Sequence, residues 1–203
     1  MTALAALQHR AAFGALALLI SGSLLGADSS PAQSSKKLKD GPETFNARAS
    51  VTSQDGRGDA YVTIRVDRYT PEKNIAIMEK ALKDGGTEQF LVELKRAPLA
   101  GQFEVGTRSF AVRWARQKAT EKGRVITFVV DQPVYFVGAG VPGAKEKTGF
   151  NLAVLQITID DAGVGEGTVV PAAKVKPGGP TGVEVESYSD APVKLHSVMR
   201  LIS

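Results

Sequence analysis

Apolar and polar residues alternate one by one in two early stretches of the chain. The runs FNARASVTS, residues 45–53, and YVTIRVD, residues 61–67, each place every second side chain on an apolar face. Alternation of this kind is typical of half-buried β-strands. Asp55-Gly56 lies between the runs and is a common hairpin signal. We therefore predict an antiparallel hairpin at the start of the folded region.

The period then changes to that of a helix in TPEKNIAIMEKALKDGG and again in TEQFLVELKRAP. Thr70 and Thr87 are suited to cap the two segments, Pro71 suits a first helical position, and Gly85 and Pro98 suit the exits. Apolar residues share one face of each segment: Ile75, Met78 and Leu82, then Phe90, Leu91 and Leu94. The pattern predicts two short helices in a hairpin.

Strand signals return after Pro98. Strands are predicted near residues 103–105, 110–114, 125–130, 150–160, 168–175, 183–188 and 192–203. Two of them, 125–130 and 150–160, are largely apolar on both faces and need cover on both sides. We expect a β-rich α+β fold of about nine strands, mainly antiparallel, as a sandwich or partly closed barrel. A second sheet would cover one face, and the helical hairpin the other.

The N-terminus has the pattern of a secretory signal peptide. Arg10 precedes an apolar segment, small residues continue to Gly26, and no acid occurs before Asp28. The apolar segment is shorter than the about 20 residues of a membrane span, although an uncleaved anchor shares these features. Cleavage is expected near Ala27 or, alternatively, before Ser35. We assign residues 1–27 to a signal peptide, 28–44 to a disordered linker and 45–203 to one β-rich domain, periplasmic or secreted.

Composition narrows the chemistry of the chain. The 203 residues include no cysteine, which excludes disulfides, thiolate nucleophiles and thiolate metal sites. Cleavage would remove one arginine and His9, taking the formal charge from +4 to +3. His196 would remain as the single histidine, expected to face the same way as Lys194 and Arg200. Basic residues are not interleaved with aromatic ones, so we expect no nucleic-acid partner, and no membrane span after processing.

One glycine motif has the spacing G-x-G-x-x-G of a dinucleotide-binding loop, at Gly138, Gly140 and Gly143. That loop requires a following helix and a parallel strand, but only AKEKT separates Gly143 from Gly149. Pro142 also lacks an N–H for a phosphate. We interpret the motif as an irregular connection between two strands, and predict no cofactor.

Three other motifs have simpler explanations. The Arg57–Asp59 tripeptide RGD is interpreted as part of a glycine-rich turn, and the S-x-x-K spacing at Ser34 and Lys37 lies in the linker. An acidic cluster at Asp160, Asp161 and Glu166 lacks the alternating ligand spacing of calcium loops. We therefore assign no catalytic, cofactor-binding or metal-ligating residue.

Two runs, DQPVYFVGAG and AKVKPGGPTGVEVESYSD, resemble uncharacterised exported bacterial proteins over most of the mature chain. The resemblance implies no activity. We predict a non-catalytic cell-envelope binding or structural module whose partner is an envelope component or a small ligand. One alternative is a carrier with an apolar cavity between sheet and helices, lined by residues such as Phe110, Trp114 and Phe128. The other is a hydrolase that uses two carboxylates from distant strands.

Overall fold

The computed structural model describes residues 38, 40–53, 56–134, 149–188 and 192–201. This part of the chain contains nine strands and one helix. The strands are β1 (Glu43–Ser53), β2 (Gly56–Val66), β3 (Gly101–Val105), β4 (Arg108–Thr120), β5 (Gly123–Val130), β6 (Leu152–Asp160), β7 (Val164–Pro177), β8 (Val183–Ser187) and β9 (Val193–Leu201), and the helix is α1 (Glu72–Arg96). The predicted signal peptide lies outside the described residues.

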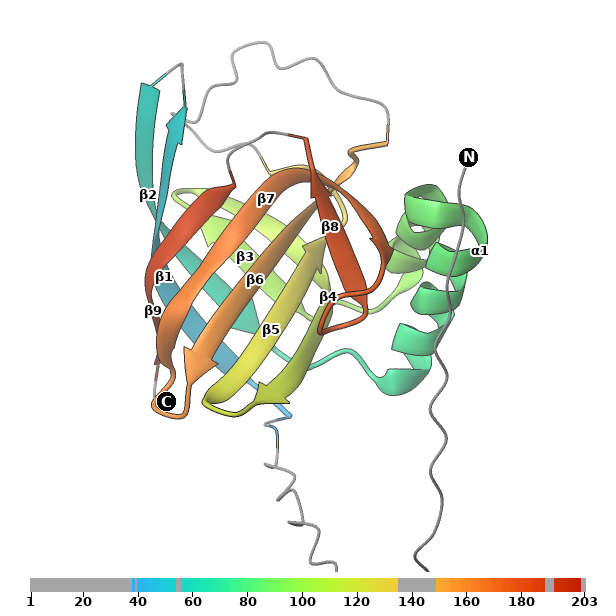
Figure 1. Cartoon of the computed structure of the whole chain (residues 1–203), viewed down its shortest axis with the longest axis horizontal. Helices are drawn as coiled ribbons and strands as arrows, with labels where there is room; N and C mark the ends of the chain where they lie inside the picture. Colours follow the sequence, from blue (N-terminus) through green and yellow to red (C-terminus); the bar gives the residue numbers. More distant parts are fainter. Residues whose placement is uncertain (1–37, 39, 54–55, 135–148, 189–191, 202–203) are drawn as a thin grey trace, which may run out of the picture. The chain divides into compact units, whose positions relative to one another are not determined.

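Eight of the strands close into an antiparallel barrel (Figure 1). The order runs from β6 through β5, β4, β3, β2, β1 and β9 to β7, and β7 pairs back with β6. β7 is long enough to pair with β9 along its first half and with β8 along its second half, so β8 is an extra strand outside the ring. The prediction of a mainly antiparallel β-rich fold is confirmed, and the sheet closes on itself.

The barrel has one apolar core inside its wall and a second outside. Phe45 and Phe128 meet in the interior with ring centroids 6.5 Å apart. The second core lies between α1 and the outer face of the wall, where Phe90 packs on Trp114 at 5.8 Å. The two-sided apolar strands β5 and β6 supply both cores, as their sequences predicted. The opposite wall of the barrel takes the place of the second sheet that we expected.

The two predicted helical segments form one kinked helix, and the predicted hairpin is not present. Within α1, Gly85 (φ −140°, ψ 16°) and Gly86 (φ 65°, ψ −158°) leave the helical conformation. Gly86 adopts a conformation that essentially only glycine tolerates. Both halves of the helix bury their apolar residues in the same outer core. The second half therefore has no need to fold back onto the first.

The two threonines predicted as helix caps attach this segment to the barrel. Thr70 N–H donates to Ala115 O at 2.8 Å, and Ala115 N–H donates back to Thr70 Oγ1 at 2.9 Å. Thr87 Oγ1 donates to Val175 O at 2.9 Å, and Val175 N–H donates to Thr87 Oγ1 at 3.0 Å. β3 pairs with β4 only up to Val112, and β6 pairs with β7 only up to Ala173. The threonines therefore satisfy backbone groups of β4 and β7 beyond those ladders.

Candidate functional site

A bulge in β9 determines which side chains enter one end of the barrel. The register between β1 and β9 shifts between Asn46 and Arg48, and Ser197 in β9 has a φ of 50°. An extra residue reverses the alternation beyond it. His196 and Lys194 consequently face outward, whereas the side chain of Arg200 turns inward and is only 18% exposed. Our expectation that all three face the same way is not met, because alternation alone does not register a bulge.

Arg124 and Glu43 form an ion pair inside the barrel. Arg124 Nη2 lies 2.5 Å from Glu43 Oε1, and Arg124 Nη1 lies 2.8 Å from Glu43 Oε2. The two side chains are 9% and 3% exposed. Glu43 is the first residue of β1 and Arg124 is the second of β5, so the pair links two strands that are not neighbours in the barrel. Two parallel hydrogen bonds of this kind fix both distance and orientation.

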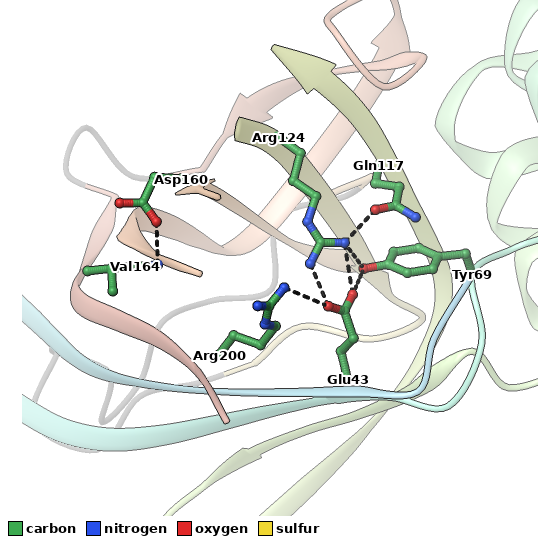
Figure 2. Close-up of polar contacts among 7 residues, drawn as sticks. All are labelled: Glu43, Tyr69, Gln117, Arg124, Asp160, Val164 and Arg200. Carbon is green, nitrogen blue, oxygen red and sulfur yellow. Dashed lines mark hydrogen bonds and ion pairs between the residues drawn. The ribbon is translucent and has the colours of Figure 1, made fainter. Parts of the chain in front are cut away.

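Three further side chains surround the pair (Figure 2). Tyr69 O–H donates to Glu43 Oε2 at 2.6 Å, and Arg124 Nη1 donates to Gln117 Oε1 at 2.6 Å. Arg200 Nη1 lies 3.7 Å from Glu43 Oε1. We call these five residues, Glu43, Tyr69, Gln117, Arg124 and Arg200, the barrel-end network. They come from β1, β4, β5, β9 and the segment before α1, at the same end of the barrel.

The network shifts the pKa values of two of its members. Burial raises the pKa of Tyr69 well above its ordinary value, and the hydrogen bond to Glu43 raises it further. Burial alone would lower the pKa of Arg124, but its hydrogen bond to Glu43 and the nearby negative charge raise it overall. Tyr69 thus stays neutral and Arg124 stays charged at neutral pH. Both carboxylate oxygens of Glu43 are engaged by these partners, an arrangement suited to fixing strands in place.

Sequence reasoning missed the network because Glu43 was assigned to the linker. Its partner carried a usable signal: Arg124 shares the inward alternation of Ile126 and Phe128 in β5. A charged residue on a buried strand face requires an opposite charge. That argument predicts an acidic partner, although it does not say which of the acidic residues it is.

Asp160 of the acidic cluster stabilises a turn. Asp160 Oδ1 accepts a hydrogen bond from Val164 N–H at 2.9 Å, as Figure 2 shows, and Asp160 O accepts one from Gly163 N–H at 3.1 Å. These bonds close the connection between β6 and β7. In the described residues, no group of three or more histidine and acidic side chains is placed to hold a metal ion.

The glycine motif at 138–143 lies outside the described residues, as do Ser34 and Lys37 of the linker. The strands on either side of the glycine motif, β5 and β6, pair antiparallel with Val130 opposite Ala153. A dinucleotide-binding unit instead places two parallel strands around its helix. The arrangement of the flanking strands therefore differs from that of a dinucleotide site.

The RGD tripeptide lies in a strand, although we expected a turn. Arg57, Gly58 and Asp59 belong to β2, and Asp59 pairs with Ser50 of β1. The ladder of this hairpin continues to Ser53 and Gly56, so the turn is shorter than the glycine content indicated.

The aromatic residues considered for a carrier cavity lie in different places. Phe128 lies in the interior core with Phe110 packed against it, whereas Trp114 lies in the outer core. A hollow of about 160 Å³, which includes open solvent, lies beside β1, β2 and β9. Its lining residues are Ala49, Ser50, Val51, Gly58, Asp59, Ala60 and Val193. This hollow is open to solvent and encloses almost no space that a water molecule could fill, unlike a ligand site.

The side of the barrel away from α1 is largely polar, and no helix of the described residues lies over it. Figure 1 shows α1 across the barrel from β1, β2 and β9, and the helix packs on β4 and β7. We call the outward side chains of β1, β2 and β9 the uncovered face. It includes Arg48, Ser50, Arg57, Asp59, Tyr61, Arg65, Lys194 and His196. In the described residues of these strands it carries four basic side chains and one acidic one.

The polar contacts on the uncovered face join residues on the same or neighbouring strands and are exposed to solvent. His196 Nε2 lies 2.8 Å from Ser50 Oγ, and Asp59 lies 3.6 Å from both Arg48 and Arg57. Tyr61 stands opposite Arg48 in the ladder and is 81% exposed.

A search of the described residues finds no helix long and apolar enough to cross a membrane. Comparisons of the chain with protein-family models, curated proteins and solved structures find no match.

Proposed function

We propose that the mature chain is a non-catalytic binding module of the cell envelope that binds an acidic polysaccharide on the uncovered face. The observation that carries the proposal is the row formed by Tyr61, Arg48 and His196, which stand opposite one another on three adjacent strands. A tyrosine ring can lie against the apolar face of a sugar ring while its hydroxyl stays in water. Arginine offers paired donors to a carboxylate.

The charge of the uncovered face supports an anionic ligand. Arg48 and Arg57 share a single acid, Asp59, at 3.6 Å, and their side chains are 56% and 71% exposed. Ion pairs this exposed contribute little to stability. The guanidinium groups are therefore available to exchange Asp59 for a ligand carboxylate. Lys194 adds a further positive charge opposite Ser50.

The interior of the barrel offers less to a ligand than the uncovered face. Its inward side chains are packed together, and its charged groups at one end are engaged with each other in the barrel-end network. The same pairing argues for a structural use of Glu43. A hydrolase would use an acid that is free to reach substrate.

The proposal is tested by calorimetric titration of the processed protein with polygalacturonate, with neutral dextran as the comparison ligand. We expect binding of the acidic polymer that weakens with added salt. Arg48→Ala combined with Tyr61→Ala should reduce the affinity at least about tenfold. Lys95→Ala, on the exposed side of α1, is the matched control and should bind like the parent.

Equal binding of dextran, or full affinity in the double variant, would contradict the proposal. Release of reducing ends from the polymer would contradict its non-catalytic part. Export is tested separately by N-terminal sequencing of protein from the envelope fraction, where we expect a first residue between about 27 and 36. Finding Met1 on cytoplasmic protein would refute export and leave the binding result standing.

A further inference from the structure

β2 continues beyond the strand that pairs with it. β3 faces β2 only from Val62 to Val66, whereas β2 begins at Gly56. On its other side β2 pairs with β1 along its whole length. In the part of the chain that the structure describes, no strand pairs with the segment 56–61 on the β3 side. This segment is an edge of the barrel wall that no described strand covers.

The backbone groups on this edge can be assigned from the ladder. Asp67 N–H donates to Ala100 O at 2.9 Å, on the β3 side of the chain. The β1–β2 register has no shift, so odd-numbered residues of β2 point their N–H and C=O groups the same way. Arg57, Asp59 and Tyr61 therefore direct three donor and acceptor pairs out from the edge. An edge of this kind is a template for another strand.

The side chains of the edge select one partner. If two β2 strands pair antiparallel about Gly58, Arg57 of each copy stands opposite Asp59 of the other. The two-fold axis repeats this contact, so the interface contains two attractive Arg57–Asp59 pairs. Glycine at the two-fold position adds no side chain between the strands. Opposite charges that face each other across a ladder stabilise the pairing, and like charges oppose it.

β8 provides a contrast within the same molecule, because it lies at the end of the strand order. Pairing two copies of β8 about Val185 would place Glu184 opposite Glu186 of the second copy. Two such acidic pairs would repel, which is a common way to prevent edge association. The charge pattern of β2 lacks this protection.

We propose that the protein forms a two-fold dimer in which the β2 edges of two copies pair antiparallel about Gly58. Arg57 of each copy bonds Asp59 of its partner, replacing the 3.6 Å contacts within one chain. The paired sheets are continuous across the interface. Two uncovered faces then lie side by side, with Arg57 engaged in the interface and Arg48 left facing solvent.

The experiment is a charge exchange at the two positions, read by sedimentation velocity on the processed protein from about 10 µM to about 1 mM. Arg57→Asp and Asp59→Arg each place like charges across the two-fold axis, and each should weaken the dimer at least about tenfold. The double variant R57D/D59R restores opposite charges and should dimerise within about threefold of the parent. Glu184→Arg in β8 is the control and should not change the dimer.

Amide hydrogen exchange locates the interface independently. Exchange at Arg57 and Asp59 should slow as protein concentration rises, with Lys95 on α1 as an internal reference. A monomer at about 1 mM, or a dimer unaffected by the single charge changes, would overturn the proposal. A double variant as weak as the singles, or slowed exchange only elsewhere, would also overturn it. Urea midpoints of the variants close to that of the parent would show that the fold is retained.

Discussion

At the scale of single residues, Tyr69 connects ionisation to stability. Its hydroxyl is withdrawn from water and donates to a carboxylate, so its pKa lies above the ordinary value of about 10. The folded chain therefore holds this proton more tightly than the unfolded chain does. The stabilisation is complete below about pH 10 and is lost as the pH rises above that value.

We expect the urea midpoint of the parent protein to fall as the pH is raised from about 9 to about 11, and to fall less steeply in Tyr69→Phe. Tyr69→Phe lacks the hydroxyl that ionises more readily in the unfolded chain than in the folded one. Raising the pH therefore costs this variant less stability. Tyr61→Phe is the matched control, because Tyr61 is 81% exposed and should leave the slope unchanged. Identical slopes in all three proteins would mean that Tyr69 does not govern the alkaline transition.

Residue patterns predicted core positions better than polar partners. Ile75, Met78 and Leu82 were placed on one helical face and all three are buried. Thr70 and Thr87 are predicted as helix caps. The N-cap of α1 is instead Pro71, with no side-chain cap, and both threonines bond strands far away in the sequence. The preference of threonine for helix caps depends on neighbouring residues. Which strand backbone group it bonds instead depends on where the β3–β4 and β6–β7 ladders end. Sequence alone did not contain that information in readable form.

At the scale of elements, Thr87 joins α1 to β7 by two hydrogen bonds in addition to the apolar packing of the outer core. Thr87→Val should remove both hydrogen bonds to Val175 and leave its backbone N–H and C=O unpaired. The expected loss is about 1–3 kcal/mol in the free energy of unfolding, measured by urea denaturation. Amide exchange at Val175 should accelerate as well.

Thr52→Val is the control for the loss of a hydroxyl, because Thr52 is exposed on β1 and should change stability by no more than about 0.5 kcal/mol. If the Val175 amide stays protected in Thr87→Val, the hydroxyl is not what anchors the helix.

The strands show what the spacing of apolar residues can and cannot predict. The largely apolar sequences of β5 and β6 identified strands with two buried faces, and both cores use them. The bulge at Ser197 is invisible to a period of two, so the inward turn of Arg200 was not foreseen. Barrel closure likewise depends on β7 serving several partners at once, which its length permits but does not specify.

At the scale of the whole molecule, the Glu43–Arg124 pair ties β1 to β5 through the barrel interior. Removing Glu43 takes the carboxylate away from buried Arg124, and removing Arg124 leaves Glu43 with the weaker ion pair to Arg200 at 3.7 Å. Arg124→Met or Glu43→Gln should each cost about 3–5 kcal/mol of unfolding free energy, and the double variant less than the sum of the two. Urea denaturation of the four proteins measures this coupling.

Arg65→Met provides the comparison for an exposed pair. Arg65 Nη2 lies 2.9 Å from Glu104, but the two side chains are 47% and 33% exposed. Its loss should cost no more than about 1 kcal/mol. Equal costs for Arg65→Met and Arg124→Met would indicate that burial of the Glu43 pair has no energetic role.

The pairing of β1 with β9 has a consequence for the order of events during synthesis. These strands are among the first and the last of the domain, with Phe45 opposite Arg200. The ring cannot close until β9 has left the ribosome, because β9 joins β1 to β7. Contacts between residues so distant in sequence form slowly. The barrel of a nascent chain therefore stays open until β9 has emerged and paired with both β1 and β7.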